Sequence, residues 1–160
     1  MANGKRYVEL MVPSPDGGML GLTCNYDTRD LLNSNCYLTY SKYLCLAQGV
    51  SDIGRFILSP RGDGYPRCSV QCWDGPYEAS FLQDSGGYLY VGSENVSELW
   101  AEFNDSGDAV KIGTPPAPNG TWYKRGKAYS SVPADCGAYY YVVQGTKSDA
   151  LEFRITDFTP

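Results

Sequence analysis

Short β-like runs separated by turn clusters constrain the fold of this chain more than any other feature. Apolar and aromatic residues gather in short runs, which are Tyr7–Val12, Met19–Thr23, Tyr37–Leu46, Ile53–Leu58, Cys68–Trp73, Tyr77–Leu82, Tyr88–Val91, Val110–Ile112, Tyr139–Gln144 and Leu151–Ile155. Clusters rich in turn residues separate these runs, at Pro13–Gly18, Ser59–Tyr65, Asp84–Gly87, Asn104–Asp108 and Gly113–Gly120. This spacing predicts an all-β fold, a small antiparallel β-barrel or sandwich.

The last run is the clearest strand signal. Leu151, Phe153 and Ile155 alternate with polar residues, as in a strand that buries one face. The composition agrees, because 14 tyrosines and only 3 methionines favour strands over helices.

At most one or two short helices are expected. Asp27–Leu32 and Glu94–Phe103 are the candidates, the second because Leu99 and Phe103 are spaced by one helical turn. The segment Gly113–Thr121 is too rich in proline for either regular element and is predicted to be an extended surface loop.

The chain is expected to form one domain over residues 1–160. Its 160 residues match an ordinary globular domain, and no repeat or linker divides them. Residues 1–6 are interpreted as a flexible arm or processing remnant, since Met1 is followed by hydrophilic residues and Lys5-Arg6 resembles a dibasic site.

Six cysteines predict three disulfides and a secreted protein. They are Cys24, Cys36, Cys45, Cys68, Cys72 and Cys136. An even number in a small chain is typical of an oxidising compartment. Cys68 and Cys72 should not pair, because four residues of strand span about 13 Å. Cys136 must close a long loop, since the nearest other cysteine is Cys72. The pairing otherwise stays open.

Two further features bear on location and partners. N-glycosylation sequons at Asn95, Asn104 and Asn119 also favour secretion. The net charge of −5, without a block of like charge, argues against a nucleic-acid partner. No apolar stretch is long enough for a membrane span.

The absence of histidine limits the available chemistry. Ser–His–Asp and Cys–His catalysis are excluded, and a zinc site is disfavoured because the cysteines also lack paired Cys-x-x-Cys spacing. Neither a metal nor a cofactor is expected. Carboxylate chemistry stays open, as in a glycoside hydrolase, with Asp74, Glu78 and Asp84 near aromatic residues as candidates.

A few residues are candidates for binding. Arg61-Gly62-Asp63 spells an adhesive tripeptide, although a β-turn with positive φ at Gly62 and Gly64 is the preferred interpretation. Trp100 and Trp122 are candidate interface anchors.

A resemblance sharpens these expectations. The features that carry the resemblance are the six cysteines, the Lys-Arg near the start and the stretch YVELMVPSPDGGMLGLTCNYDTRD. In these features the chain resembles the secreted necrotrophic effectors, which are host-selective proteinaceous toxins of wheat-infecting fungi. The resemblance implies a β-barrel that is released by removal of a pro-segment. It also implies that the protein triggers cell death in plants with a matching sensitivity gene, and that it binds host proteins such as pathogenesis-related proteins. No functional residue is carried over.

The sequence therefore predicts a secreted, non-catalytic virulence effector of the host apoplast that binds a host plant protein. A carbohydrate-binding protein or a carboxylate-dependent glycoside hydrolase is the alternative.

Overall fold

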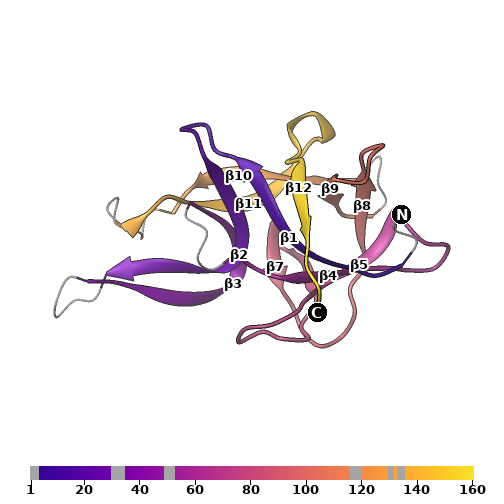
Figure 1. Cartoon of the computed structure of the whole chain (residues 1–160), viewed down its shortest axis with the longest axis horizontal. Helices are drawn as coiled ribbons and strands as arrows, with labels where there is room; N and C mark the ends of the chain where they lie inside the picture. The colour runs from indigo at the N-terminus through magenta and orange to yellow at the C-terminus, as the bar shows by residue number, and fades with distance from the viewer. Residues whose placement is uncertain (1–3, 30–34, 49–52, 116–119, 130–131, 133–135) are drawn as a thin grey trace.

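A computed structural model describes residues 4–29, 35–48, 53–115, 120–129, 132 and 136–160 (Figure 1). Its strands are β1 (Arg6–Pro13), β2 (Met19–Arg29), β3 (Cys36–Gln48), β4 (Phe56–Pro60), β5 (Arg67–Cys72), β6 (Leu82–Ser85), β7 (Tyr88–Val91), β8 (Leu99–Phe103), β9 (Ala109–Gly113), β10 (Trp122–Ala128), β11 (Tyr139–Gly145) and β12 (Phe153–Asp157). A short 3-10 helix, Lys147–Asp149, precedes β12. The all-β prediction is confirmed.

The strands form one 12-stranded sheet that closes on itself. The pairing of β10 with β9 closes a circuit through β11, β3, β2, β1 and β12. The pairing of β1 with β4 closes a second circuit through β5, β8, β9 and β12. All of these pairs are antiparallel, so the sheet is an antiparallel barrel. Closure matters because an open edge strand invites pairing with other chains.

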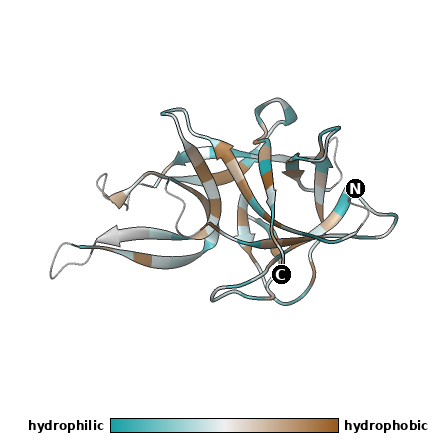
Figure 2. Ribbon diagram, viewed as in Figure 1, coloured by the Kyte–Doolittle hydropathy of each residue, from teal (hydrophilic) through white to brown (hydrophobic). Residues whose placement is uncertain are grey.

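Alternation along the strands builds the core. On β1, Val8, Leu10 and Val12 are at most 3% exposed, and the residues between them are partly exposed. Figure 2 shows hydrophobic ribbon concentrated on the central strands, with hydrophilic ribbon toward the outer loops. Phe153 is fully buried on β12, which confirms the alternation expected at the C-terminus.

Neither candidate helix forms within the described residues. Residues 27–29 end β2, and Leu99–Phe103 is β8. The four-residue spacing of Leu99 and Phe103 misled the prediction, because residues four apart share a face in a strand as well as in a helix. Residues 30–32 lie outside the described part of the chain.

The expected N-terminal arm is shorter than predicted. Arg6 begins β1, and its guanidinium donates to the Asp157 carboxylate at 2.7 Å. Arg6 therefore belongs to the sheet and is tied to the last strand, because β1 and β12 pair directly.

Candidate binding site

The Arg61–Asp63 tripeptide forms the connection between β4 and β5. Its turn is closed by hydrogen bonds from the Gly64 amide to the Arg61 carbonyl and from the Arg61 amide to the Arg67 carbonyl, both at 2.9 Å. Gly62 and Gly64 have φ of +56° and +101°, as the turn interpretation requires. Asp63 is exposed on the loop.

Arg61 is engaged within the protein. Its Nε lies 3.9 Å from Oε2 of Glu98, and Arg67 binds the same carboxylate at 2.9 Å. The first distance is too long for a hydrogen bond, and the buried Nε of Arg61 makes none. The hydrogen bond from Arg67, with the charges of both arginines, lowers the pKa of Glu98. Arg61 therefore faces Glu98, which favours the structural interpretation of the turn.

The two tryptophans have different environments. Trp122 is 1% exposed, so its assignment as an interface anchor is wrong: it lies at the start of β10, and Lys147 covers its ring at 5.4 Å. Trp100 is partly exposed and lines a surface hollow with Tyr65 and Phe103. Of the two, only Trp100 presents surface to a partner.

The three candidate carboxylates are not brought together. Asp84 accepts hydrogen bonds from the Tyr123 hydroxyl at 2.7 Å and from the Gly87 amide at 3.2 Å, so it holds the turn between β6 and β7. Glu78 lies exposed in the turn after β5. Asp74 lines a pocket.

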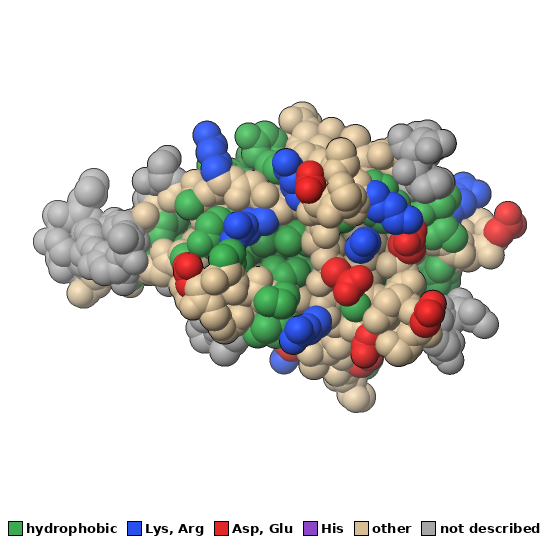
Figure 3. Space-filling view, turned by 90° about the horizontal axis from the view of Figure 1, so that it is seen from above, with side chains coloured by type: hydrophobic (Ala, Val, Ile, Leu, Met, Phe, Trp, Pro, Cys, Tyr) green, Lys and Arg blue, Asp and Glu red, His purple; other side chains and the backbone are tan. Residues whose placement is uncertain are grey.

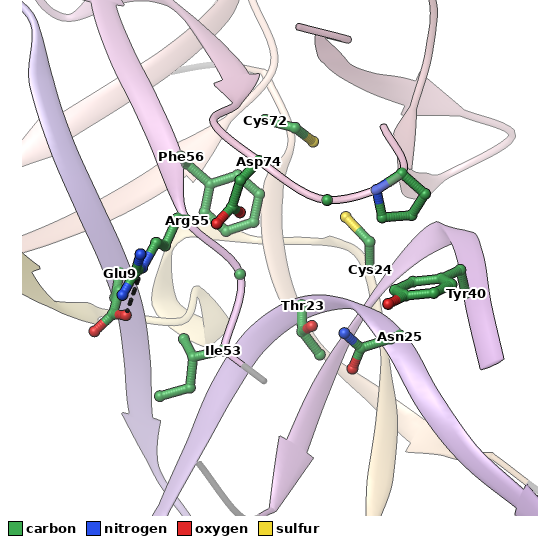
Figure 4. A pocket seen from close by; sticks show the side chains of 13 residues that line it. Glu9, Thr23, Cys24, Asn25, Tyr40, Ile53, Arg55, Phe56, Cys72 and Asp74 are labelled. Carbon is green, nitrogen blue, oxygen red and sulfur yellow. Dashed lines mark hydrogen bonds and ion pairs between the residues drawn. The ribbon is translucent and has the colours of Figure 1, made fainter. Parts of the chain in front are cut away.

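That pocket has a volume of about 350 Å³ and lies where the β2–β3 pair meets β4 and β5 (Figure 4). Its described lining is Glu9, Thr23, Cys24, Asn25, Tyr40, Ile53, Gly54, Arg55, Phe56, Cys72, Asp74, Gly75 and Pro76. The pocket has two acidic residues in its described lining. Glu9 is paired with Arg55 at 3.4 Å, whereas Asp74 has no ion-pair partner among the described residues. No group of metal ligands occurs among the residues that the structure describes.

The cysteines form fewer bonds than predicted. The structure contains one disulfide, Cys36–Cys136, and the other cysteines are thiols. Cys45 and Cys68 belong to separate buried clusters on different strands, so they do not meet. One of the three predicted disulfides is present, and it closes the long loop expected for Cys136; Cys68 and Cys72 are not bonded to each other, as predicted.

Cys24 and Cys72 do meet, across the pocket. Figure 4 shows their sulfur atoms projecting toward each other. A hydrogen bond between them raises the pKa of Cys24 and lowers that of Cys72. These two thiols are therefore positioned to be oxidised together.

The β2–β3 hairpin projects from the barrel (Figure 1). Among the described residues, 25–29 pair only with 36–40, because β2 leaves β1 after Gly21 and β3 joins β7 and β11 only from Tyr43 onward. A two-stranded ribbon alone is marginally stable. The disulfide from Cys36 to Cys136 ties this ribbon to the segment before β11.

The projecting hairpin carries the most exposed aromatic side chains described. Tyr37 and Tyr40 are 51% and 50% exposed. They are three residues apart on a strand and so project from opposite faces. The sequence analysis did not single them out, because their spacing matches no single face.

A second group of tyrosines covers the outer side of the barrel. Ring-to-ring contacts link Tyr43 to Tyr88 at 5.6 Å, Tyr88 to Tyr141 at 5.6 Å, and Tyr141 to Tyr129 at 4.2 Å. The sequence of the run Tyr88–Val91 already indicated this group of exposed tyrosines. Its leucine and valine are buried, so its tyrosines must face outward.

On the face of the molecule in Figure 3, acidic and basic side chains are interspersed.

Within the described residues, no helix has the length and apolar character needed to cross a bilayer.

No protein-family model, curated protein or solved structure matches this chain.

Proposed function

We propose that this chain is a secreted, non-catalytic effector that binds a host plant protein in the apoplast and triggers cell death in sensitive plants. The observation that carries the proposal is the projecting hairpin, which exposes a tyrosine on each face and is anchored by a disulfide. Tyrosine contributes a large, rigid contact area at low entropic cost and is enriched in binding hot spots. The resemblance to necrotrophic effectors supplies the host context.

Anchoring by the disulfide supports a recognition role. A flexible ribbon would lose conformational entropy on binding, whereas a ribbon already held in place loses less. A disulfide also persists in an extracellular compartment and is rare in the cytosol. A sensitivity-gene product or a pathogenesis-related protein is the proposed partner class.

The experiment is infiltration of the pure protein into leaves of sensitive and insensitive cultivars, with reducing-sugar release from plant cell wall measured in parallel. Necrosis restricted to sensitive genotypes, with no sugar release, is expected. Equal responses in all genotypes, or sugar release that is lost on Asp74→Asn, would contradict the proposal and favour the glycoside hydrolase.

A further inference from the structure

A hollow on the outer side of the barrel combines aromatic walls with one cation. Its volume is about 320 Å³, and the described residues that line it are Tyr43, Tyr88, Lys127 and Tyr141. Four strands supply these residues, because Tyr43 lies on β3, Tyr88 on β7, Lys127 on β10 and Tyr141 on β11. This volume lies at the lower end of the range of about 300–1,000 Å³ for small-molecule sites.

The rings form a corner. Tyr88 meets Tyr43 at an interplanar angle of 80° and Tyr141 at 69°. The strand pairings hold this arrangement, since Tyr43 lies opposite Tyr90 and Val143 lies opposite Tyr88. The corner is therefore built by the sheet itself.

The polar groups of the hollow are unused by the protein. Among the described residues, Lys127 has no ion-pair partner, whereas Arg6, Arg55, Arg67 and Lys147 are each paired with a carboxylate. The hydroxyls of the three lining tyrosines likewise make no hydrogen bond within the described part of the chain. A ligand could therefore use an ammonium and several hydroxyls.

We propose that this hollow binds an acidic sugar ring, the uronate unit of an acidic polysaccharide. The C–H bonds on a pyranose face carry partial positive charge, which the negative face of an aromatic ring attracts. The ring hydroxyls suit the tyrosine hydroxyls, and the single carboxylate suits the single ammonium of Lys127. A neutral sugar leaves Lys127 unpaired, and a phosphate is better matched by several cations or a bidentate arginine. This site is separate from the hairpin and does not rest on the proposed function.

The test is a titration of the full chain, followed by NMR chemical shifts, with tetragalacturonate, its methyl ester and tetraglutamate. Tetragalacturonate should shift signals of Tyr43, Tyr88, Lys127 and Tyr141 and bind at least about tenfold more tightly than the other two probes. The affinity should weaken in high salt, which screens an exposed charge pair.

Variants locate the site. Lys127→Gln should weaken tetragalacturonate binding about tenfold or more, and Tyr88→Leu should weaken it similarly with an unchanged melting temperature. Lys5→Gln, another exposed lysine outside the hollow, is the matched control and should bind as wild type. If Tyr88→Leu lowers the melting temperature, the binding of tetragalacturonate by Lys127→Gln becomes the test of the site. No binding, equal binding of the methyl ester or of tetraglutamate, or unchanged binding by Lys127→Gln would overturn the proposal.

Discussion

The Cα atoms of Cys36 and Cys136 lie 5.7 Å apart, although 100 residues separate them in the sequence. This bond joins the projecting hairpin to the segment before β11, on the side where the Tyr26 ring of the hairpin contacts Tyr129 and Tyr139. Its role is testable as a stability effect.

Replacing both cysteines, as Cys36→Ala with Cys136→Ala, should lower the free energy of unfolding by about 2–5 kcal/mol, because the crosslink restricts a long loop in the unfolded chain. Urea denaturation measures this. The reduced wild-type protein is the control and should unfold near the same urea concentration. A double variant as stable as the oxidised wild type would contradict the structural role of the bond.

The buried thiols should be unreactive. Burial raises the pKa of Cys45 and of Cys68 to about 12, from a reference of 9.0. At pH 8, a thiol with a pKa of about 12 forms about a thousandfold less thiolate than a thiol with a pKa of 9.0. The thiolate is the reactive form. Iodoacetamide at pH 8, with mapping by mass spectrometry, should leave both unmodified until urea unfolds the protein. Rapid alkylation of either thiol in the native state would contradict their placement.

We expect Asp84 to stabilise the fold, and we expect Asp74 to be dispensable for necrosis. Asp84→Ala leaves the buried Tyr123 hydroxyl without its partner and should cost about 1–3 kcal/mol in denaturant unfolding. Asp74→Asn and Glu78→Gln are matched controls at exposed acids, and their necrotic activity should stay within a few-fold of wild type. A thousandfold loss in either control, with the fold intact, would point to carboxylate catalysis.

The Arg61–Asp63 turn should depend on its glycine more than on its acid. Gly62→Val places a β-carbon at φ +56°, where it would lie 2.9 Å from the Arg67 guanidinium. The resulting strain of about 1–2 kcal/mol should lower the melting temperature by several degrees. Asp63→Glu should leave both melting and necrosis unchanged. Loss of necrosis in Asp63→Glu with normal melting would instead identify the loop as a contact site.

The sequence predicted the strands where one face is strictly apolar. Residues such as Val8, Leu10 and Phe153 alternate with polar neighbours, and this local pattern is enough to place a strand. Strand β10 was missed because only its first residues, Trp122 and Tyr123, are buried, while its later residues include the exposed Arg125 and Lys127. Where a strand leaves the core, neither of its faces is buried, so its sequence does not show the alternation of apolar and polar residues that predicts a strand.

The candidate site was harder to predict, because it depends on contacts between distant segments. The sequence drew attention to Trp122, but only the folded sheet shows that this ring is buried, with Lys147 over it. Conversely, the exposure of Tyr37 follows from β2 and β3 extending beyond their neighbouring strands. The pairing of the cysteines was open for the same reason, since the cysteine count does not report which thiols meet: Cys36 and Cys136 are bonded, and Cys24 and Cys72 face each other.

The most direct measurement compares leaf necrosis caused by wild type, Tyr37→Ala, Tyr40→Ala and the double variant in a sensitive cultivar. Loss of a hot-spot tyrosine should lower potency about tenfold or more, and the single variants should show which face of the hairpin contacts the host protein. Val96→Ala, an exposed apolar side chain outside the hairpin, is the control and should act as wild type. Full necrotic potency in the double variant, with an unchanged melting temperature, would contradict the assignment of the hairpin as the recognition surface.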